Sequence, residues 1–343
     1  MVVPVFGLCF KSLPQTEIQI GRVTFLGPSR LTRTRKRFGL YHTLAEYKAK
    51  LTMSFPLWDE ADAVAVLKTR RDPTDKDNTT DFKVVSESFL VLASAIHGYS
   101  RRGKHPIALR RRAIGEPVTV SVFGSTEGTL RVNSSRIDPL HGPIDLGKRW
   151  RNYAKHSHLF ALCKMCDTKQ GATNWRRALW VAAQLRGQSF LAATLYGAFL
   201  ANMIAIERLV VSQDDKTESA LVDRLLAIFG WISGEDPDAW RDMVHRLYQR
   251  RCSYVHEGDH ELITPTDVLD SDEILDNLLA NLCRHPDWIG CKKDLIRVSE
   301  EHKARLLLGL AVKRPKTLTW SNRIGRTPAN DSEAVGLSNW SVY

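Results

Sequence analysis

Residues 236–258 read DPDAWRDMVHRLYQRRCSYVHEG and carry the signals of one long helix. Asp236 can cap the first free backbone N–H groups, and Pro237 follows at the first helical position, where its missing N–H is not needed. Gly258 can end the helix because glycine reaches the left-handed conformation without strain. Apolar residues between these ends recur at helical spacing, at Trp240, Val244, Leu247, Tyr248 and Tyr254. The spacing predicts an amphipathic helix that packs against other helices.

The sequence on both sides of this helix continues the same periodicity. Five further helices are predicted, beginning at Asn174, Ser189, Thr217, Thr266 and Lys293. The first would stop at Gly187, and the last would end near Ala311. The second carries a continuous apolar stripe, made of Leu191, Leu195, Phe199, Met203, Ile206 and Val210. Residues 174–313 are therefore predicted to form an α-helical domain.

The chain changes character near residue 150. Before that point, four short apolar runs favour strands: 1–10, Glu17–Leu26, Pro117–Phe123 and Gly128–Val132. Phe82–His97 fits a helix or a buried strand, with the helix favoured, and Asn133–Gly147 is expected to be an irregular connection. The predicted fold class is α+β. It comprises a β-rich N-terminal domain over 1–150, a connector over 151–173, the helical domain and a loosely ordered tail over 314–343.

The formal net charge of the sequence is +11. A balance this basic favours a polyanionic partner such as RNA, because each cation that neutralises a phosphate releases a counterion. The predicted RNA-binding residues lie in basic stretches of the N-terminal half, and they are Arg33, Arg35, Arg37, Arg110, Arg111 and Arg112. The alternative interpretation is that these charges form an ordinary solvated surface.

Membrane and metal sites are not expected. No window approaches the roughly 18 apolar residues of a membrane helix, and six cysteines without disulfide-framework spacing favour a reducing, cytoplasmic setting. The pattern His156, His158, Cys163 and Cys166 has residue types that suit zinc. However, the apolar run 159–162 between the two pairs favours packed side chains, so neither a metal nor a cofactor is predicted.

The end of the helix quoted above carries the residues best suited to chemistry. Arg250 and Arg251 precede His256 by six and five residues, and Tyr248 and Ser253 add two hydroxyls. A phosphodiester needs such groups, because its oxygens require hydrogen-bond donors and its cleavage requires a group that moves protons. The simpler interpretation is a basic helix end, since cations there are favoured by the helix dipole.

This stretch resembles the HEPN superfamily, in particular the ApeA-like HEPN domains. The matching residues are Leu247, Tyr248, Arg251, Val255, His256 and Gly258, together with Glu207 in the upstream run IAIERL at 204–209. The resemblance covers about 110 residues, roughly 174–285, and does not extend to the N-terminal half. It implies an α-helical HEPN bundle with an Arg-x4-His ribonuclease motif.

What the resemblance implies is a metal-independent endoribonuclease, of a kind found in defence or toxin systems. His256 would act as general base or acid, Arg251 would stabilise the phosphoryl oxygens, and Glu207 would pair with Arg251 and orient it. The site would be built across a homodimer, and the N-terminal domain would sense a phage or another trigger. Apolar residues of the second and fourth helices are more numerous than one small bundle needs, and either the dimer or the N-terminal domain could cover them. They include Phe199, Met203, Val244 and Leu247.

One position departs from the family pattern. Cys252 stands where active members often have Asn, Asp or Ser, and a thiol is a poor hydrogen-bond partner. Ser253 could supply the polar group, or Arg250 could be the working arginine. The departure leaves open an alternative function, a non-catalytic HEPN module that binds RNA or nucleotides or mediates dimerisation in a defence assembly.

Overall fold

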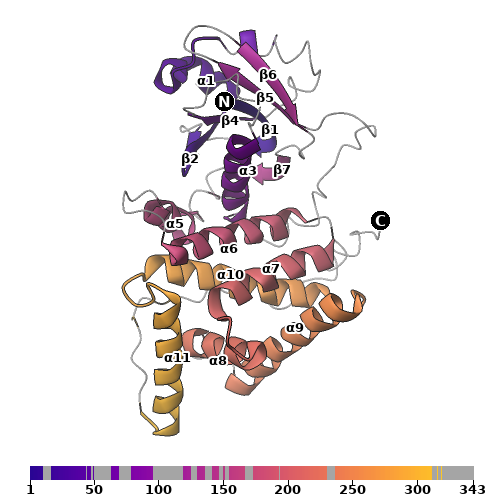
Figure 1. Ribbon diagram of the computed structural model, residues 1–343, viewed down its shortest axis with the longest axis vertical. Helices are drawn as coiled ribbons and strands as arrows, with labels where there is room; N and C mark the ends of the chain where they lie inside the picture. The colour runs from indigo at the N-terminus through magenta and orange to yellow at the C-terminus, as the bar shows by residue number, and fades with distance from the viewer. Residues whose placement is uncertain are drawn as a thin grey trace. The chain divides into compact units, whose positions relative to one another are not determined.

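The computed structural model describes residues 1–10, 17–43, 45–47, 49, 63–68, 79–95, 119–124, 130–135, 141–146, 150, 154–166, 173–192, 194–229, 236–310, 315 and 318. The chain divides into two compact units, Met1–Ile96 with Ile107–Tyr153 and His97–Pro106 with Ala154–Tyr343. The first unit contains a sheet and the second is helical (Figure 1), so the chain is α+β, as predicted.

The sheet of the first unit has the strand order β2-β3-β4-β1-β5-β6. Its strands are β1 (Val2–Cys9), β2 (Glu17–Ile20), β3 (Val23–Leu26), β4 (Ala63–Leu67), β5 (Thr119–Gly124) and β6 (Leu130–Ser135). These pairings are antiparallel, whereas β7 (His141–Asp145) pairs parallel with the second half of β1. β2 and β3 form a hairpin in which Ile20 faces Val23, and Gly21 provides the positive φ that this two-residue turn needs.

Helical segments cover both faces of β4, and every residue of this strand is buried. On one face, α1 (Pro28–Thr34) inserts Leu31 beside Val64, Val66 and the buried ring of Tyr47. On the other, α3 (Thr79–Ser94) contacts β2, β3 and β4, and the rings of Phe89 and Phe25 lie 6.2 Å apart. Burial on two faces explains why this strand is apolar throughout rather than alternating.

The second unit consists of helices. They are α5 (Leu159–Cys166), α6 (Asn174–Leu191), α7 (Leu195–Val210), α8 (Thr217–Phe229), α9 (Pro237–Glu257), α10 (Pro265–Arg284) and α11 (Lys292–Leu307). α7 contacts α6, α8, α9, α10 and α11, and it lies beside α6 and α10 in Figure 1. None of the helices in the described ranges is both long and apolar enough to cross a membrane.

The quoted helix forms as its sequence predicts. Asp236 accepts a hydrogen bond from the N–H of Asp238, and Gly258 ends the helix with a φ of 75°. Two other helix boundaries were predicted wrongly, because α6 continues through Gly187 and Ser189, and Thr194 caps α7 instead. Gly187 and Ser189 are buried, and tertiary packing of α6 outweighs the cost of about 1 kcal/mol that glycine adds inside a helix.

Irregular segments were the other source of error. The stretch Asn133–Gly147, predicted to be irregular, contains the end of β6 and all of β7. The predicted connector 151–173 contains α5. Both elements form through tertiary contacts, with β1 and with α6 and α10, which local sequence does not reveal. The predicted tail 314–343 lies outside the described residues, apart from Pro315 and Leu318.

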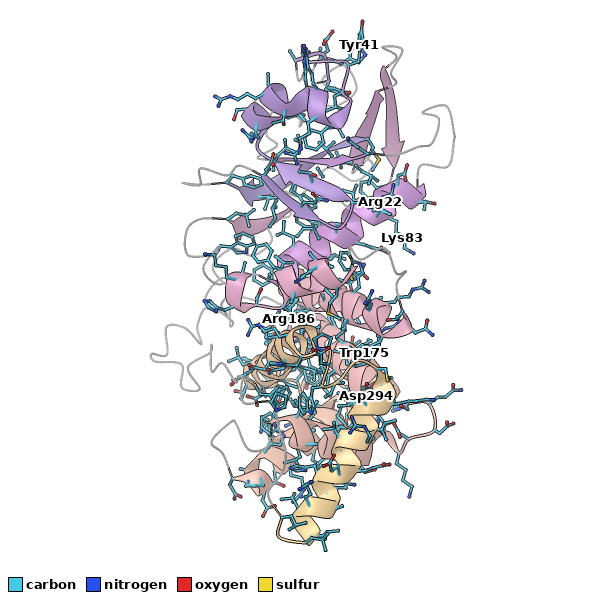
Figure 2. The ribbon with its side chains drawn as sticks, turned by 90° about the vertical axis from the view of Figure 1, so that its left-hand side faces the viewer. Arg22, Tyr41, Lys83, Trp175, Arg186 and Asp294 are labelled. Atoms are coloured by element: carbon cyan, nitrogen blue, oxygen red, sulfur yellow. The ribbon has the colours of Figure 1, made fainter. Side chains whose placement is uncertain are left out.

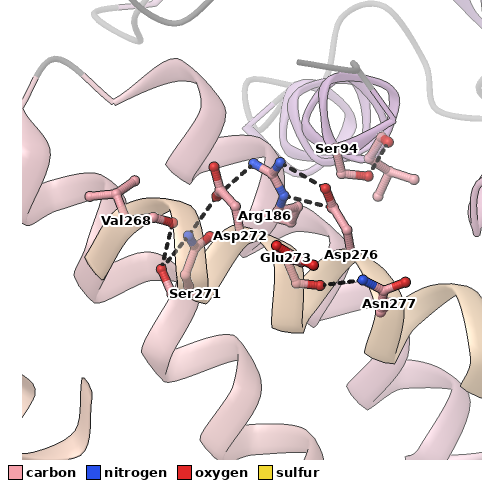
Figure 3. A network of polar contacts seen from close by, with 10 residues as sticks. Ser94, Arg186, Val268, Ser271, Asp272, Glu273, Asp276 and Asn277 are labelled. Carbon is pink, nitrogen blue, oxygen red and sulfur yellow. Dashed lines mark hydrogen bonds and ion pairs between the residues drawn. The ribbon is translucent and has the colours of Figure 1, made fainter. Parts of the chain in front are cut away.

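A buried ion-pair network joins α6, α7 and α10 (Figure 3). The Arg186 side chain is 4% exposed, and its Nε and Nη2 donate to the two carboxylate oxygens of Asp276 at 2.8 and 3.1 Å. Its Nη1 lies 3.2 Å from Oδ1 of Asp272, which also accepts a 2.7 Å hydrogen bond from Asn202 on α7. Charges this deeply buried are tolerated only when they are paired. The network therefore fixes the positions of the three helices relative to one another.

We predict that Arg186→Met destabilises the helical unit by about 3–5 kcal/mol, because it leaves two buried carboxylates without their cation. Urea unfolding followed by the helical circular dichroism signal measures this change. Arg241→Met is the matched control, since Arg241 forms an exposed ion pair with Asp238, and its effect should stay within about 1 kcal/mol. Equal effects of the two substitutions would contradict the structural role of Arg186.

Candidate functional site

The site is carried by α9, which packs on its neighbours through one apolar face. Trp240, Val244 and Leu247 are fully buried, and the Trp240 ring meets Phe229 of α8 edge-on at 6.3 Å. Phe199 and Met203 of α7 are buried as well, so these core residues are not available for a dimer, contrary to expectation. The exposed large apolar residues of the two helices are instead Ile204, at 40%, and Val255, at 48%.

Arg251 is held by Glu207 in a two-pronged ion pair, as expected. The Arg251 Nε lies 2.9 Å from Oε1 of Glu207, and its Nη2 donates to Oε2 at 3.0 Å. Burial raises the pKa of the Glu207 carboxyl above its ordinary value of 4.5, and the charge and hydrogen bond of Arg251 offset only part of that rise. The pair joins α7 to α9 and sets the direction of the guanidinium.

Two cations fix the end of α7 that bears Glu207. Arg224 of α8 is buried and donates to the carbonyl of Val210, while its other contacts go to both carboxylate oxygens of Asp215. Lys292 of α11 donates to the carbonyls of Arg208 and Val211. The last carbonyls of a helix lack partners within the helix, so these cations satisfy them and hold the C-terminal turn in place.

Tyr248 and Cys252 form a second pair on α9, one turn apart. Interaction with the Cys252 side chain, followed by burial, raises the pKa of the Tyr248 hydroxyl. The hydroxyl is therefore protonated at neutral pH and can donate a hydrogen bond one helical turn from Arg251.

His256 and Arg251 are not brought together within one chain. His256 is exposed, and on an ideal helix it lies about 140° around the axis and about 7.5 Å along it from Arg251. Ser253 and Arg250 are partly exposed, and the Nε of Arg250 is buried without a hydrogen-bond partner. The described residues therefore gather a cation, a carboxylate and a hydroxyl at one place, with the imidazole on the neighbouring surface of the helix.

Two aromatic contacts beside the site were missed by sequence reasoning. The Tyr196 ring at the start of α7 lies 5.6 Å from that of Tyr254 and 5.3 Å from that of His260. His260 follows the glycine that ends α9, where no helical periodicity marks it. The only available signal was the aromatic character of Tyr196 at the start of a helix.

The predicted RNA-binding arginines differ in their exposure and contacts, and three of them lie outside the described residues. Arg33 is exposed at the end of α1, and Arg35 begins the short helix η1 (Arg35–Phe38). Arg37 is engaged, because its Nη1 donates to Glu17 at 2.7 Å and its guanidinium lies over the Phe38 ring. Arg110, Arg111 and Arg112 lie outside the described residues.

Metal ligands do not cluster in the described part of the chain. There, no group of three or more His, Cys, Asp or Glu side chains is arranged to hold a metal ion. Among the residues whose types suit zinc, His158 and Cys163 are buried in the helical unit and His156 is exposed.

In comparisons with known proteins, no family model, no curated protein and no solved structure matched this chain.

We predict that Arg251→Ala destabilises the protein more at neutral pH than near pH 4.5. Without the cation, the folded-state pKa of Glu207 rises further above its unfolded-state value. The free energy of unfolding therefore falls as pH rises from the unfolded-state pKa to the folded-state pKa. The extra loss at neutral pH should be about 2 kcal/mol in urea unfolding. Adding Glu207→Gln, which cannot ionise, should remove the pH dependence, and an equal loss at both pH values would contradict this account.

Proposed function

We propose that the helical unit is a HEPN-type endoribonuclease domain that cuts RNA without a metal ion. The observation that carries the proposal is the two-pronged Glu207–Arg251 pair beside the Tyr248 hydroxyl, with His256 exposed farther along the same helix. A buried carboxylate that aims an arginine, next to a protonated hydroxyl, suits an anionic phosphate better than it suits a purely structural contact. The family assignment itself rests on the motif resemblance.

The proposed reaction is an internal transesterification. The RNA 2′-hydroxyl loses its proton to an imidazole and attacks the adjacent phosphorus, forming a 2′,3′-cyclic phosphate. The bond to the 5′-oxygen of the next nucleotide breaks, and this oxygen receives a proton from an imidazolium. Arg251 and Tyr248 donate hydrogen bonds to the phosphoryl oxygens, where negative charge increases in the transition state.

The reaction needs one group that takes a proton and another that gives one, and a single chain offers one His256. A two-fold dimer would supply the second imidazole without any new residue. Two contacts join α7 and α9: Glu207 pairs with Arg251, and Tyr196 contacts Tyr254. Ile204 lies one turn before Glu207 and Val255 one turn after Arg251, so both lie on the side of the ion pair where Tyr196 meets Tyr254. These exposed apolar residues are the proposed dimer contact around the site.

In this proposal the domain is an effector of a cytoplasmic defence or toxin system. The first unit would bind the trigger, a phage component or another signal, and the helical unit would respond by cutting RNA. The described cysteines are free thiols, which suits a reducing compartment.

We predict that His256→Ala and Arg251→Ala each lower RNA cleavage at least about a hundredfold while the fold is retained. The assay incubates full-length protein with total RNA and with tRNA in EDTA and analyses the ends for 2′,3′-cyclic phosphate. His245→Ala is the matched control, because this histidine is exposed on the same helix and pairs with Glu218. Unchanged cleavage by the His256 variant, or a strict need for Mg²⁺, would refute the proposed chemistry.

We further predict that the double substitution Ile204→Lys, Val255→Lys converts a dimer into a monomer and abolishes cleavage, because it places like charges at the contact. Sedimentation velocity of the full-length chain measures the first effect. Phe160→Lys is the control, since Phe160 is similarly exposed, at 43%, but lies on α5. A monomer that still cuts RNA would rule out the shared site.

One observation favours the alternative, a HEPN module that binds RNA or nucleotides without cutting. Glu207 neutralises the charge of Arg251. Wild-type protein that binds RNA through Arg251 but leaves it intact would establish this alternative. Restored cutting by Cys252→Asn would identify the thiol as the cause.

A further inference from the structure

A strongly basic surface lies on the first unit, over α1, η1 and the turn that follows. Its five cations are Arg30, Arg33, Arg35, Lys36 and Arg37. The carboxylate of Glu17 pairs with two of them, with Arg37 at 2.7 Å and with Arg30 at 3.6 Å. Both cations hold the pKa of Glu17 below its ordinary value, so the carboxylate stays ionised and fixes this end of the surface to β2.

Three of the cations form no ion pair with a described residue. Arg33, Arg35 and Lys36 have no acidic partner among the described residues. The backbone beneath them is fixed, because the N–H groups of Leu40 and Gly39 donate to the carbonyls of Arg35 and Lys36. Gly39 makes this reversal with a φ of 66°, which ends η1.

An exposed aromatic ring follows this turn. Tyr41 is 67% exposed and projects from the first unit in Figure 2. Its ring meets that of His42 edge-on at 5.4 Å, and the His42 ring in turn packs edge-on against Tyr47, which is fully buried. His42 also lies 3.6 Å from Glu46. The Tyr41 ring is therefore exposed, and its neighbour His42 packs against the buried core residue Tyr47.

We propose that this surface binds single-stranded RNA. Arg33, Arg35 and Lys36 neutralise successive phosphates, and Tyr41 stacks on an unpaired base. Cations alone would hold any polyanion, whereas an exposed aromatic face five residues after Lys36 in the same segment fits a strand whose bases are not already stacked in a duplex. That the polymer is RNA rests on the proposed function. The contact itself does not depend on cleavage.

The experiment measures RNA affinity in the full-length His256→Ala protein, so that cleavage cannot interfere. The probe is a short fluorescent RNA of mixed sequence, used as a single strand and as the matching duplex, over a series of salt concentrations. The test variants are the triple substitution Arg33→Gln, Arg35→Gln, Lys36→Gln, and separately Tyr41→Ala and Tyr41→Phe. The control removes three exposed cations of the helical unit, by Lys164→Gln, Arg177→Gln, Lys293→Gln.

We expect the triple substitution to weaken single-strand binding at least about tenfold and to reduce the slope of log affinity against log salt by about 2, because three phosphate contacts are lost. Tyr41→Ala should weaken it about tenfold without changing that slope, and Tyr41→Phe should bind like its parent. The duplex should bind more weakly than the single strand and should not respond to Tyr41→Ala.

Two results would overturn the proposal. If the triple substitution and the control triple have equal effects, the surface is an ordinary solvated one. If the duplex binds as well as the single strand and Tyr41→Ala changes nothing, the surface holds polyanions through charge alone. The readout is independent of catalysis, so failure of cleavage by the wild-type protein would leave the binding result standing.

Discussion

The helical unit depends on how one buried guanidinium is neutralised. Arg186 lies between Asp272 and Asp276, and Asn202 of α7 donates to the first of these carboxylates. Desolvating these charges costs several kcal/mol unless each is paired, so helix packings that separate them are excluded. The ion pairs thereby select one register of α6 against α10, and the hydrogen bond of Asn202 ties α7 to the same register.

The position of α7 in turn sets the candidate site. Glu207 lies near its end, where Arg224 and Lys292 bind the last carbonyls, and it reaches across to Arg251. The two ion-pair systems differ in burial, and this difference separates their roles. Arg186 is enclosed and serves packing, whereas the Arg251 side chain is 22% exposed and stays partly open to solvent. A partly exposed, pre-aimed cation is what binding of an anion requires.

The two units suit complementary parts of the proposed activity. In our proposals, the basic surface of the first unit, with the Tyr41 ring, holds an RNA strand through charge and stacking. The helix end of the second unit acts on one phosphodiester. Separate binding and cutting surfaces would let affinity depend on salt while the chemical step depends on Arg251 and His256.

The sequence by itself determined the elements whose ends are marked by local chemistry. Asp236, Pro237 and Gly258 define α9 because capping and the left-handed conformation are properties of single residues, and the Glu207–Arg251 pairing followed from the motif resemblance. Only tertiary structure decided that Gly187 lies inside α6, that β7 pairs with β1, and that Phe199 and Leu247 are core rather than interface. These features depend on which segments far apart in the sequence pack together. Burial in such packing can outweigh a local propensity of about 1 kcal/mol, and local sequence does not encode that burial.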